Sequence, residues 1–500
     1  MSLPKKIALS LVVIASIFSI WWGYENIRGK RAWEDFKKEW EAKGEVFGFK
    51  KVIPKAIPSE KNFAHTPLLK PLGEIKYNAD LTQAKPIDPK KHEEAKKLLK
   101  IEDKPSVSET GNGWRAGETN NLAAWQNYFQ EKEGWEHPEK PVKPSADVLL
   151  ALSKFEPVMA ELAQAAKDRP LCRFDNKYEA HWNMRLEHLK VYRQLVFAYA
   201  LRASAHLANE DPEAALADIQ MGLFIAESIR EEPTIVSQLV RFACLNTIFQ
   251  PLWEGLKGSR WSAKQLTELE QKLAGIDLLE GYRISMRGER VLTNESIRVL
   301  REESSRWAEE NEEVDLEAFT WLPAGFLYSS QKRISEMHFM YLKPMVDHKA
   351  RRIRPDLAVK LEKRMTELRK IRYGVQYNIL ASIFIPGLSK VALRTGGAQT
   401  GVDHALIACR LELHKLKSGE YPEQLANLET AAPNDTYSGK PYVYKPDSNG
   451  RYQIYGLGWN EKDDGGKTVW KKNQKGELEM DWEKGDLVWS YLPLIPPEGE

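Results

Sequence analysis

Residues 199–222 read YALRASAHLANEDPEAALADIQMG, and the four residues NEDP at positions 209–212 decide the fold of the central part of the chain. Asn209 interrupts a long helical pattern, Asp211 is a favourable N-cap, and Pro212 suits the first position of a new helix. Two helices must therefore turn back on each other here, which predicts an antiparallel helical hairpin.

Small residues on both sides of this turn allow the two helices to pack closely. Ala203 and Ala215 lie twelve residues apart, and Ile219 and Gly222 follow on one face of the second helix. With Tyr199 on the first helix, this set resembles one hairpin of a tetratricopeptide repeat. No second copy follows at a period of about 34 residues. We therefore expect an irregular, solenoid-like stack of helical hairpins instead of a regular repeat.

Helical patterns of the same kind extend through residues 144–398. They predict three further helices, at 148–166, 178–208 and 234–256. Pro251 should kink or end the last of these, because proline lacks the amide hydrogen that a helix needs. Ser262 and Gln265 match a capping box, which predicts that another helix begins there.

An uncharged apolar run, IALSLVVIASIFSIWWGY, extends from Ile7 to Tyr24. As a helix it would be about 27 Å long, close to the ~30 Å hydrocarbon core of a bilayer. No Ala-x-Ala pattern precedes a plausible cleavage point, which favours a retained transmembrane anchor at 1–30 over the alternative, a cleaved signal peptide. Lys5 and Lys6 should hold the short N-terminus inside. We thus expect a single-pass protein of the cytoplasmic membrane with its bulk on the periplasmic or extracytoplasmic side.

Residues 31–143 are expected to connect the anchor to the helical body. Trp33, Phe36 and Trp40 recur at helical spacing, which predicts a short juxtamembrane helix. Six prolines between residues 52 and 90 favour an extended segment that lies against other parts of the molecule.

The pattern changes after residue 398. A helix ends at Gly419, and short strands then alternate with turns at PYVYK (441–445), RYQIYGLG (451–458) and GDLVW (485–489). These strands predict a small C-terminal α+β module with an antiparallel sheet. The fold is therefore expected to be mainly α, in four parts: 1–30, 31–143, 144–398 and 399–500.

Three motifs follow one another in this module: GEYP at 419–422, PNDTYSGKPYVY at 433–444, and YGLGWN at 455–460 with GDLVW. In this order they resemble the globular domain of the major pseudopilins of type II secretion. The resemblance implies a calcium loop and a place in a secretion or pilus-like assembly. Thr436 departs from the proline usual in that family, and the pseudopilin cleavage motif is absent from residues 1–24. We therefore do not expect a filament subunit.

The candidate ligands of a Ca²⁺ ion are Asn460, Asp463, Asp464 and Asp486, and the resemblance implies that Leu457 offers its carbonyl oxygen. Ca²⁺ prefers six to eight hard oxygen ligands, which an acidic, glycine-rich loop can supply. The sequence NEKDDGG at 460–466 is equally typical of a tight turn without metal. Both alternatives stay open, and no other cofactor is expected.

Charge and motifs limit the remaining classes of function. The 73 Lys and Arg residues nearly balance 71 Asp and Glu, so nucleic acid is not an expected partner. Cys172, Cys244 and Cys409 lie far apart and are expected to be small buried residues. His181 and His188 lie on one helix face, where packing is preferred to metal binding. Gly-x-Ser-x-Gly, Walker and His-Glu-x-x-His motifs are all absent from the sequence.

The whole chain also resembles large, single-anchored bacterial envelope proteins, through phrases such as NFAHTPLLKPL (62–72) and SQLVRFACL (237–245). That likeness implies no activity. We expect a non-enzymatic, membrane-anchored extracytoplasmic scaffold or adaptor that binds protein partners. The alternative is an envelope hydrolase whose acidic residues converge only in the folded chain.

Overall fold

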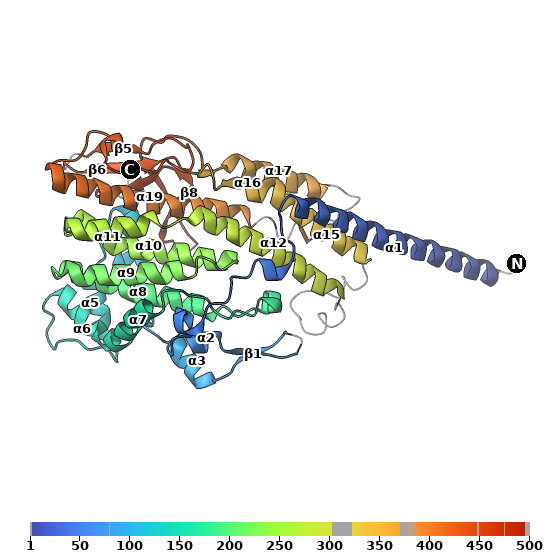
Figure 1. Cartoon of the computed structure of the whole chain (residues 1–500), viewed down its shortest axis with the longest axis horizontal. Helices are drawn as coiled ribbons and strands as arrows, with labels where there is room; N and C mark the ends of the chain where they lie inside the picture. The colour runs from blue at the N-terminus through green and yellow to red at the C-terminus, as the bar shows by residue number, and fades with distance from the viewer. Residues whose placement is uncertain are drawn as a thin grey trace.

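The computed structural model describes residues 3–79, 81–302, 323–370, 380–381, 385, 387–447, 450–474 and 476–495. Its body is a stack of helices with small antiparallel sheets near the C-terminus, and a long N-terminal helix projects from one end (Figure 1). The prediction of a mainly α fold with an N-terminal apolar helix and small C-terminal sheets is confirmed.

The projecting helix is α1 (Leu3–Ala42). The segment after it contains the short helices η1 (Phe49–Lys51), η2 (Ser59–Lys61), η3 (Phe63–His65), α2 (Lys70–Gly73), α3 (Pro89–Lys96), α4 (Val107–Thr110), η4 (Trp114–Ala116) and α5 (Leu122–Glu131), with the antiparallel pair β1 (Ile75–Tyr77) and β2 (Ala84–Pro86). The body begins with α6 (Pro144–Leu152), η5 (Ser153–Phe155), α7 (Glu156–Asp168), η6 (Tyr178–Asn183), α8 (Glu187–Ala208), α9 (Pro212–Ser228), α10 (Ile235–Lys257), α11 (Ala263–Ala274) and α12 (Leu278–Glu302). It continues with α15 (Ala324–Met337), the π-helix η7 (His338–Leu342), α16 (Lys343–Met345), the pair β3 (Val346–Asp347) and β4 (Arg352–Ile353), α17 (Pro355–Lys370), α19 (Ser389–Ser418) and η9 (Leu425–Asn427).

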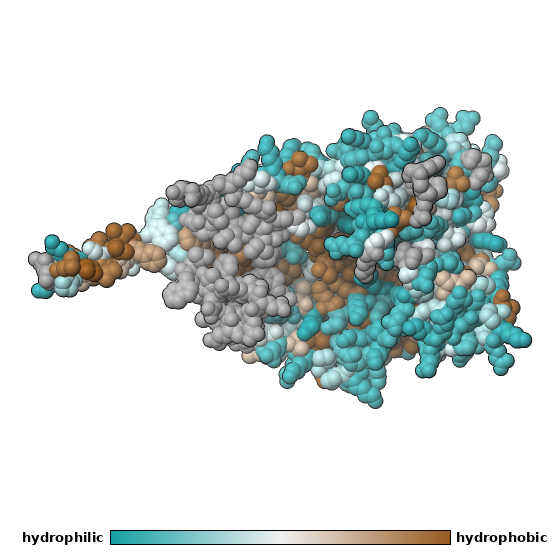
Figure 2. Space-filling model, turned by 180° about the vertical axis from the view of Figure 1, so that it is seen from behind, coloured by the Kyte–Doolittle hydropathy of each residue, from teal (hydrophilic) through white to brown (hydrophobic). Residues whose placement is uncertain are grey.

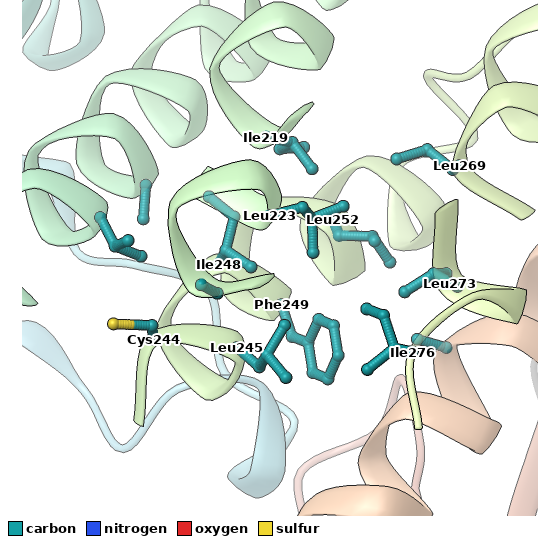
Figure 3. Close-up of a cluster of buried hydrophobic side chains, with 14 of the residues drawn as sticks. Ile219, Leu223, Cys244, Leu245, Ile248, Phe249, Leu252, Leu269, Leu273 and Ile276 are labelled. Atoms are coloured by element: carbon teal, nitrogen blue, oxygen red, sulfur yellow. The ribbon is translucent and has the colours of Figure 1, made fainter. Parts of the chain in front are cut away.

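The NEDP turn forms as its sequence predicts. Asp211 caps α9, because its Oδ1 accepts a hydrogen bond from the Ala214 amide at 3.1 Å. The α8–α9 hairpin then packs on α10. A Cβ on Gly222 would come within 2.5 Å of Ile248 Cδ1, so this glycine lets α9 and α10 approach closely. Figure 3 shows the buried side chains around this contact, among them Phe249.

Two predicted helices differ from the structure in their bounds, and the helix predicted at 234–256 agrees with α10. The helix predicted at 148–166 is divided into α6 and α7, because Pro157 in the first turn of α7 cannot donate to the turn before it. The helix predicted at 178–208 begins only with α8, since His181 has a positive φ of 49° inside η6. Pro251 does not end α10, where buried neighbours on both sides keep the helix continuous. Tertiary packing outweighs the lost hydrogen bond there.

The capping box is confirmed. Ser262 Oγ accepts from the Gln265 amide at 3.3 Å, and Gln265 Oε1 accepts from the Ser262 amide at 2.9 Å. α11 therefore begins where the sequence predicts.

The three predicted strands are β5 (Val443–Pro446), β6 (Tyr452–Gly456) and β9 (Leu487–Trp489), and they form one antiparallel sheet in the order β5-β6-β9. Between β6 and β9 lies a further hairpin, β7 (Thr468–Lys472) and β8 (Leu478–Gly485), which the sequence analysis did not predict. α19 ends before Gly419 as expected, but it begins at Ser389, so the boundary placed between residues 398 and 399 falls inside this helix. One continuous core joins body and sheet residues, including Leu223 and Trp489.

Candidate functional site

The two halves of α1 have opposite surroundings. Residues 3–21 are exposed, and the helix is long and apolar enough to cross a membrane. Figure 2 shows hydrophobic residues around the projecting part. The second half, from residue 25 onward, packs against α15 of the body. One unbroken helix therefore contains both the apolar segment and its attachment to the body.

The second half of α1 crosses α15 at two glycines. A Cβ on Gly29 would lie 2.3 Å from the Gly325 carbonyl oxygen. A Cβ on Gly325 would lie 2.0 Å from the backbone carbonyl oxygen of Glu25. Asn26 Oδ1 also accepts a hydrogen bond from the Gly325 amide at 2.9 Å. Any side chain at either glycine would force the helices apart, so the crossing requires glycine at both positions.

Aromatic side chains extend this contact toward the body. Trp33, Phe36, Phe47 and Phe339 form a buried cluster, and Trp40 stacks on Phe339 with ring centroids 3.8 Å apart. The predicted juxtamembrane helix thus exists, but as the continuation of α1 and not as a separate helix. We call these five residues the aromatic cluster.

Glu45, buried just beyond α1, is surrounded by three cations. Its carboxylate accepts a hydrogen bond from Lys343 and lies 3.4 Å from Arg290 Nη2 and 3.8 Å from Arg287 Nε. The Arg290 guanidinium in turn lies over two rings of the aromatic cluster, at 4.6 and 4.7 Å. Burial acts to raise the pKa of Glu45, but the bond from Lys343 and the charges of Arg290 and Arg287 outweigh it and hold this pKa below its usual range. We call this group the Glu45 clamp.

Three of the candidate calcium ligands lie in the turn between β6 and β7. Asn460 Nδ2 donates to Asp464 Oδ2 at 2.8 Å, and Asp463 Oδ1 accepts from the Gly465 amide at 2.9 Å. These are hydrogen bonds of a tight turn. Leu457 donates its amide to a buried carboxylate elsewhere in the module at 3.3 Å. These bonds are the ones that the metal-free alternative predicts.

Asp486, immediately before β9, is different. Its side chain is buried, Oδ2 accepts from the Gly466 amide at 2.7 Å, and Oδ1 has no hydrogen-bond partner among the described residues. Burial raises the pKa of Asp486 despite hydrogen bonds from the Gly466 and Asp464 amides, and the charges of Asp463 and Asp464 add to the rise. A bound cation would give Oδ1 a partner and would offset the effects that raise the pKa of Asp486. Within the described parts of the chain, however, no three His, Cys, Asp or Glu residues are grouped to hold a metal ion. Calcium binding stays a prediction that rests on Asp486.

Of the other candidate groups, His188, Cys244 and Cys409 are packed into the core, whereas His181 lies in η6, so the two histidines do not share one helix face as expected. His188 Nε2 bonds to Glu232 at 2.8 Å, as expected for a packing residue. Cys244 and Cys409 are buried as predicted, and Cys172 is half-buried. Burial raises the pKa of Cys172 and of Cys244 to about 12, which keeps both thiols protonated at neutral pH.

A serine, a histidine and an aspartate are aligned at the surface. His65 Nδ1 lies 3.1 Å from Ser59 Oγ, and its Nε2 lies 2.8 Å from Asp175 Oδ2. Sequence reasoning missed this group because its members come from segments 110 residues apart. Ser59 and Asp175 are exposed, so water competes for both bonds, whereas a hydrolytic triad works in a site that excludes water. We interpret the group as a tie between the proline-rich segment and the body.

Buried carboxyl groups of the body are held by structural partners. Asp218 receives two hydrogen bonds from Arg202, at 2.8 and 2.5 Å. Burial raises the pKa of Asp403 to about 6, although the charge of Arg351 and a bond from Tyr442 act against it. These bonds connect neighbouring elements of the core, and the predicted hydrolase alternative draws no support from them.

No family model, no curated protein and no solved structure matches this chain. The resemblances drawn from its motifs therefore stay predictions, and the functional argument depends on the geometry described above.

Replacement of Glu45 by Gln should destabilise the protein by about 2 kcal/mol at pH 7, because three cations lose their counter-charge. The pKa of Glu45 is lowered in the folded chain, so its contribution is present above the unfolded pKa near 4.5 and is lost as the pH falls through the folded value. Urea unfolding of the detergent-solubilised protein across pH 3–8 measures this. The control Glu39→Gln, at an exposed pair with Lys43, should change stability by less than about 0.5 kcal/mol. A Glu45→Gln defect that stays constant down to pH 3 would contradict the clamp.

Calcium should raise the thermal midpoint of the wild-type protein if Asp486 is a ligand. At a free Ca²⁺ concentration 100-fold above Kd, binding should raise the free energy of unfolding by about 2.7 kcal/mol. Asp486→Asn should abolish the gain, while Asp481→Asn, whose carboxylate lies 3.5 Å from Lys471 on the same hairpin, should preserve it. Scanning calorimetry with calcium or a chelator decides between the two alternatives, and an unchanged wild-type midpoint would establish the metal-free turn.

Proposed function

We propose that this chain is a single-pass scaffold or adaptor of the cytoplasmic membrane, whose helical body binds protein partners on the periplasmic or extracytoplasmic side. The observation that carries the proposal is the continuity of α1, which joins an exposed apolar segment directly to the packed body (Figure 1). A body attached in this way is held in a defined orientation to the membrane. That is what a scaffold requires.

The apolar segment itself touches the body, which supports a retained anchor over a cleaved signal peptide. Trp21 packs on Phe326 of α15 with ring centroids 5.9 Å apart. The glycine crossing follows along the same helix pair, and the Glu45 clamp, just beyond α1, continues the attachment to α12 and α16. Cleavage after the apolar run would remove one side of this contact. Lys5 and Lys6 support a cytoplasmic N-terminus.

Charged grooves on the body support protein partners. One groove of about 480 Å³ lies between the residues after η1, α9, α10 and α12, and a second of about 790 Å³ lies between α11 and α19. Both are lined by residues of opposite charge, among them the pairs Arg241–Glu227 and Arg410–Glu270. Polar surfaces of mixed sign are typical of the rims of protein interfaces. The proposal of a secretion or pilus-like envelope assembly, with calcium in the C-terminal loop, rests on the pseudopilin resemblance.

Membrane topology is tested by cysteine labelling in a Cys172→Ser background, because Cys244 and Cys409 are buried. Val142→Cys, at a side chain that is 81% exposed, should react with a membrane-impermeant maleimide once the outer membrane is permeable. Leu3→Cys should react only after the cytoplasmic membrane is lysed. The reverse pattern would overturn the orientation, and a chain lacking residues 1–24 in the mature protein would overturn the anchor.

The scaffold role is tested by loosening the junction without removing the anchor. Gly325→Leu should separate α1 from α15, and Gly23→Leu is a matched control on α1 because a Cβ there meets nothing within 4 Å. Cross-linking in intact cells with quantitative mass spectrometry should recover a defined set of envelope proteins with the wild type and with Gly23→Leu, and several-fold less with Gly325→Leu. Equal recovery with both variants, at equal membrane insertion, would contradict the proposal.

A further inference from the structure

A cavity of about 440 Å³ opens between α10, α19, η4 and β8. Its walls are mainly apolar and include Leu239, Phe242, Phe249, Val391 and Trp482. This volume lies in the range of about 300–1,000 Å³ that is usual for small-molecule sites. On the back of the body, Figure 2 shows a hydrophobic area beside hydrophilic residues.

Three cations stand among these apolar side chains: Arg115 of η4, and Lys390 and Arg394 of α19. No carboxylate is found among the lining residues that the structure describes. Among the described residues, none of these three cations forms an ion pair with a lining residue, although the charges of Glu479 and Glu483 on β8 act on Arg394. The cavity therefore combines an apolar interior with three cations that have no carboxylate beside them among the described lining residues.

The charged grooves of the body differ in this respect. In the groove between α9, α10 and α12, Arg241 lies 2.7 Å from Glu227. In the groove between α11 and α19, Arg410 lies 2.7 Å from Glu270. Arginines in both grooves thus form close ion pairs, whereas Arg115 and Arg394 form none with the described lining residues of the apolar cavity.

Arg115 is fixed in position despite the missing counter-charge. Its Nε donates to Asn246 Oδ1 at 2.8 Å, and its guanidinium lies over the rings of Trp114 and Trp482, at 4.2 and 4.8 Å. Burial, and then the charge of Arg394, lower the pKa of Arg115 to about 9. An anion bound between the guanidinium groups of Arg115 and Arg394 would offset the repulsion between them.

Trp482 is also held against the cavity by a specific contact. A Cβ on Gly397 would lie 2.1 Å from Trp482 Cζ3, so only glycine lets the indole ring lie directly on α19. The Arg394 guanidinium also lies over this indole ring, 4.9 Å from the ring centroid. The hairpin β7–β8 thus supplies one wall and orients one of the cations.

We propose that this cavity binds a single-chain amphiphilic carboxylate, such as a free long-chain fatty acid, with its carboxylate at Arg115 and Arg394 and its chain along α10. Guanidinium groups match the geometry of a carboxylate and can bind it through paired hydrogen bonds. The apolar walls suit one alkyl chain, and the volume favours a single chain over a two-chain lipid. This inference is independent of the scaffold role.

The test uses the full-length protein in nanodiscs of phosphatidylcholine, with radiolabelled laurate as the probe and empty nanodiscs as the blank. Laurate should bind saturably at one site per chain, and neither dodecanol nor dodecyltrimethylammonium should compete. Arg394→Gln removes an exposed cation without breaking an ion pair, and it should weaken laurate binding about tenfold. Arg230→Gln removes the same charge from the groove between α9, α10 and α12 and should leave binding unchanged.

Equal competition by dodecanol would show that the cations do not recognise the ligand, and it would overturn the proposal. Equal laurate affinities of the Arg394→Gln and Arg230→Gln variants would also overturn the proposal. If phosphatidylglycerol in the nanodisc displaces laurate at the same mole fraction, the anion comes from a membrane lipid and the assignment to a free carboxylate is wrong.

Discussion

The backbones of α1 and α15 touch at Gly29 and Gly325, and the position of the whole body depends on this contact. A methyl group at either glycine would overlap a carbonyl oxygen, at 2.3 or 2.0 Å. The glycines therefore allow an approach that brings the aromatic cluster and Glu45 against α12, η7 and α16. Without that close approach, only the polypeptide that follows α1 would connect this helix to the body. With it, an apolar helix and a helical body form one unit.

The cationic side chains at the junction and at the cavity of this molecule have different surroundings. At the junction, Glu45 compensates a set of cations that includes the buried Arg290, so the positive charge there serves stability. At the cavity between α10 and α19, no carboxylate stands beside Arg115 and Arg394 among the described lining residues. Two guanidinium groups close to apolar walls repel each other, and an anionic ligand between them would offset this repulsion. The contrast separates groups that hold the fold from groups available to a ligand.

Local sequence patterns predicted much of the architecture. The NEDP turn, the capping box at Ser262 and the helix end at Gly419 depend on hydrogen bonds within a few residues, so the sequence alone identifies them. The strands of the C-terminal sheet were also predicted from alternating aromatic residues. Helix breaks were predicted less well, because Pro157 divides a helix and Pro251 does not, and the difference lies in the surrounding packing.

The sequence by itself determined that the chain is mainly helical, where its main turns lie, and that its N-terminal helix is apolar and long enough to cross a membrane. Those properties follow from short-range backbone chemistry and from composition. Only the tertiary structure decided that α1 continues into the body, that Glu45 meets residues about 245 and 298 positions away, and that Trp482 joins η4 and α19 around a cavity. The contacts responsible join distant segments at particular distances and orientations. No local pattern specifies such contacts, because they depend on the packing of the whole chain.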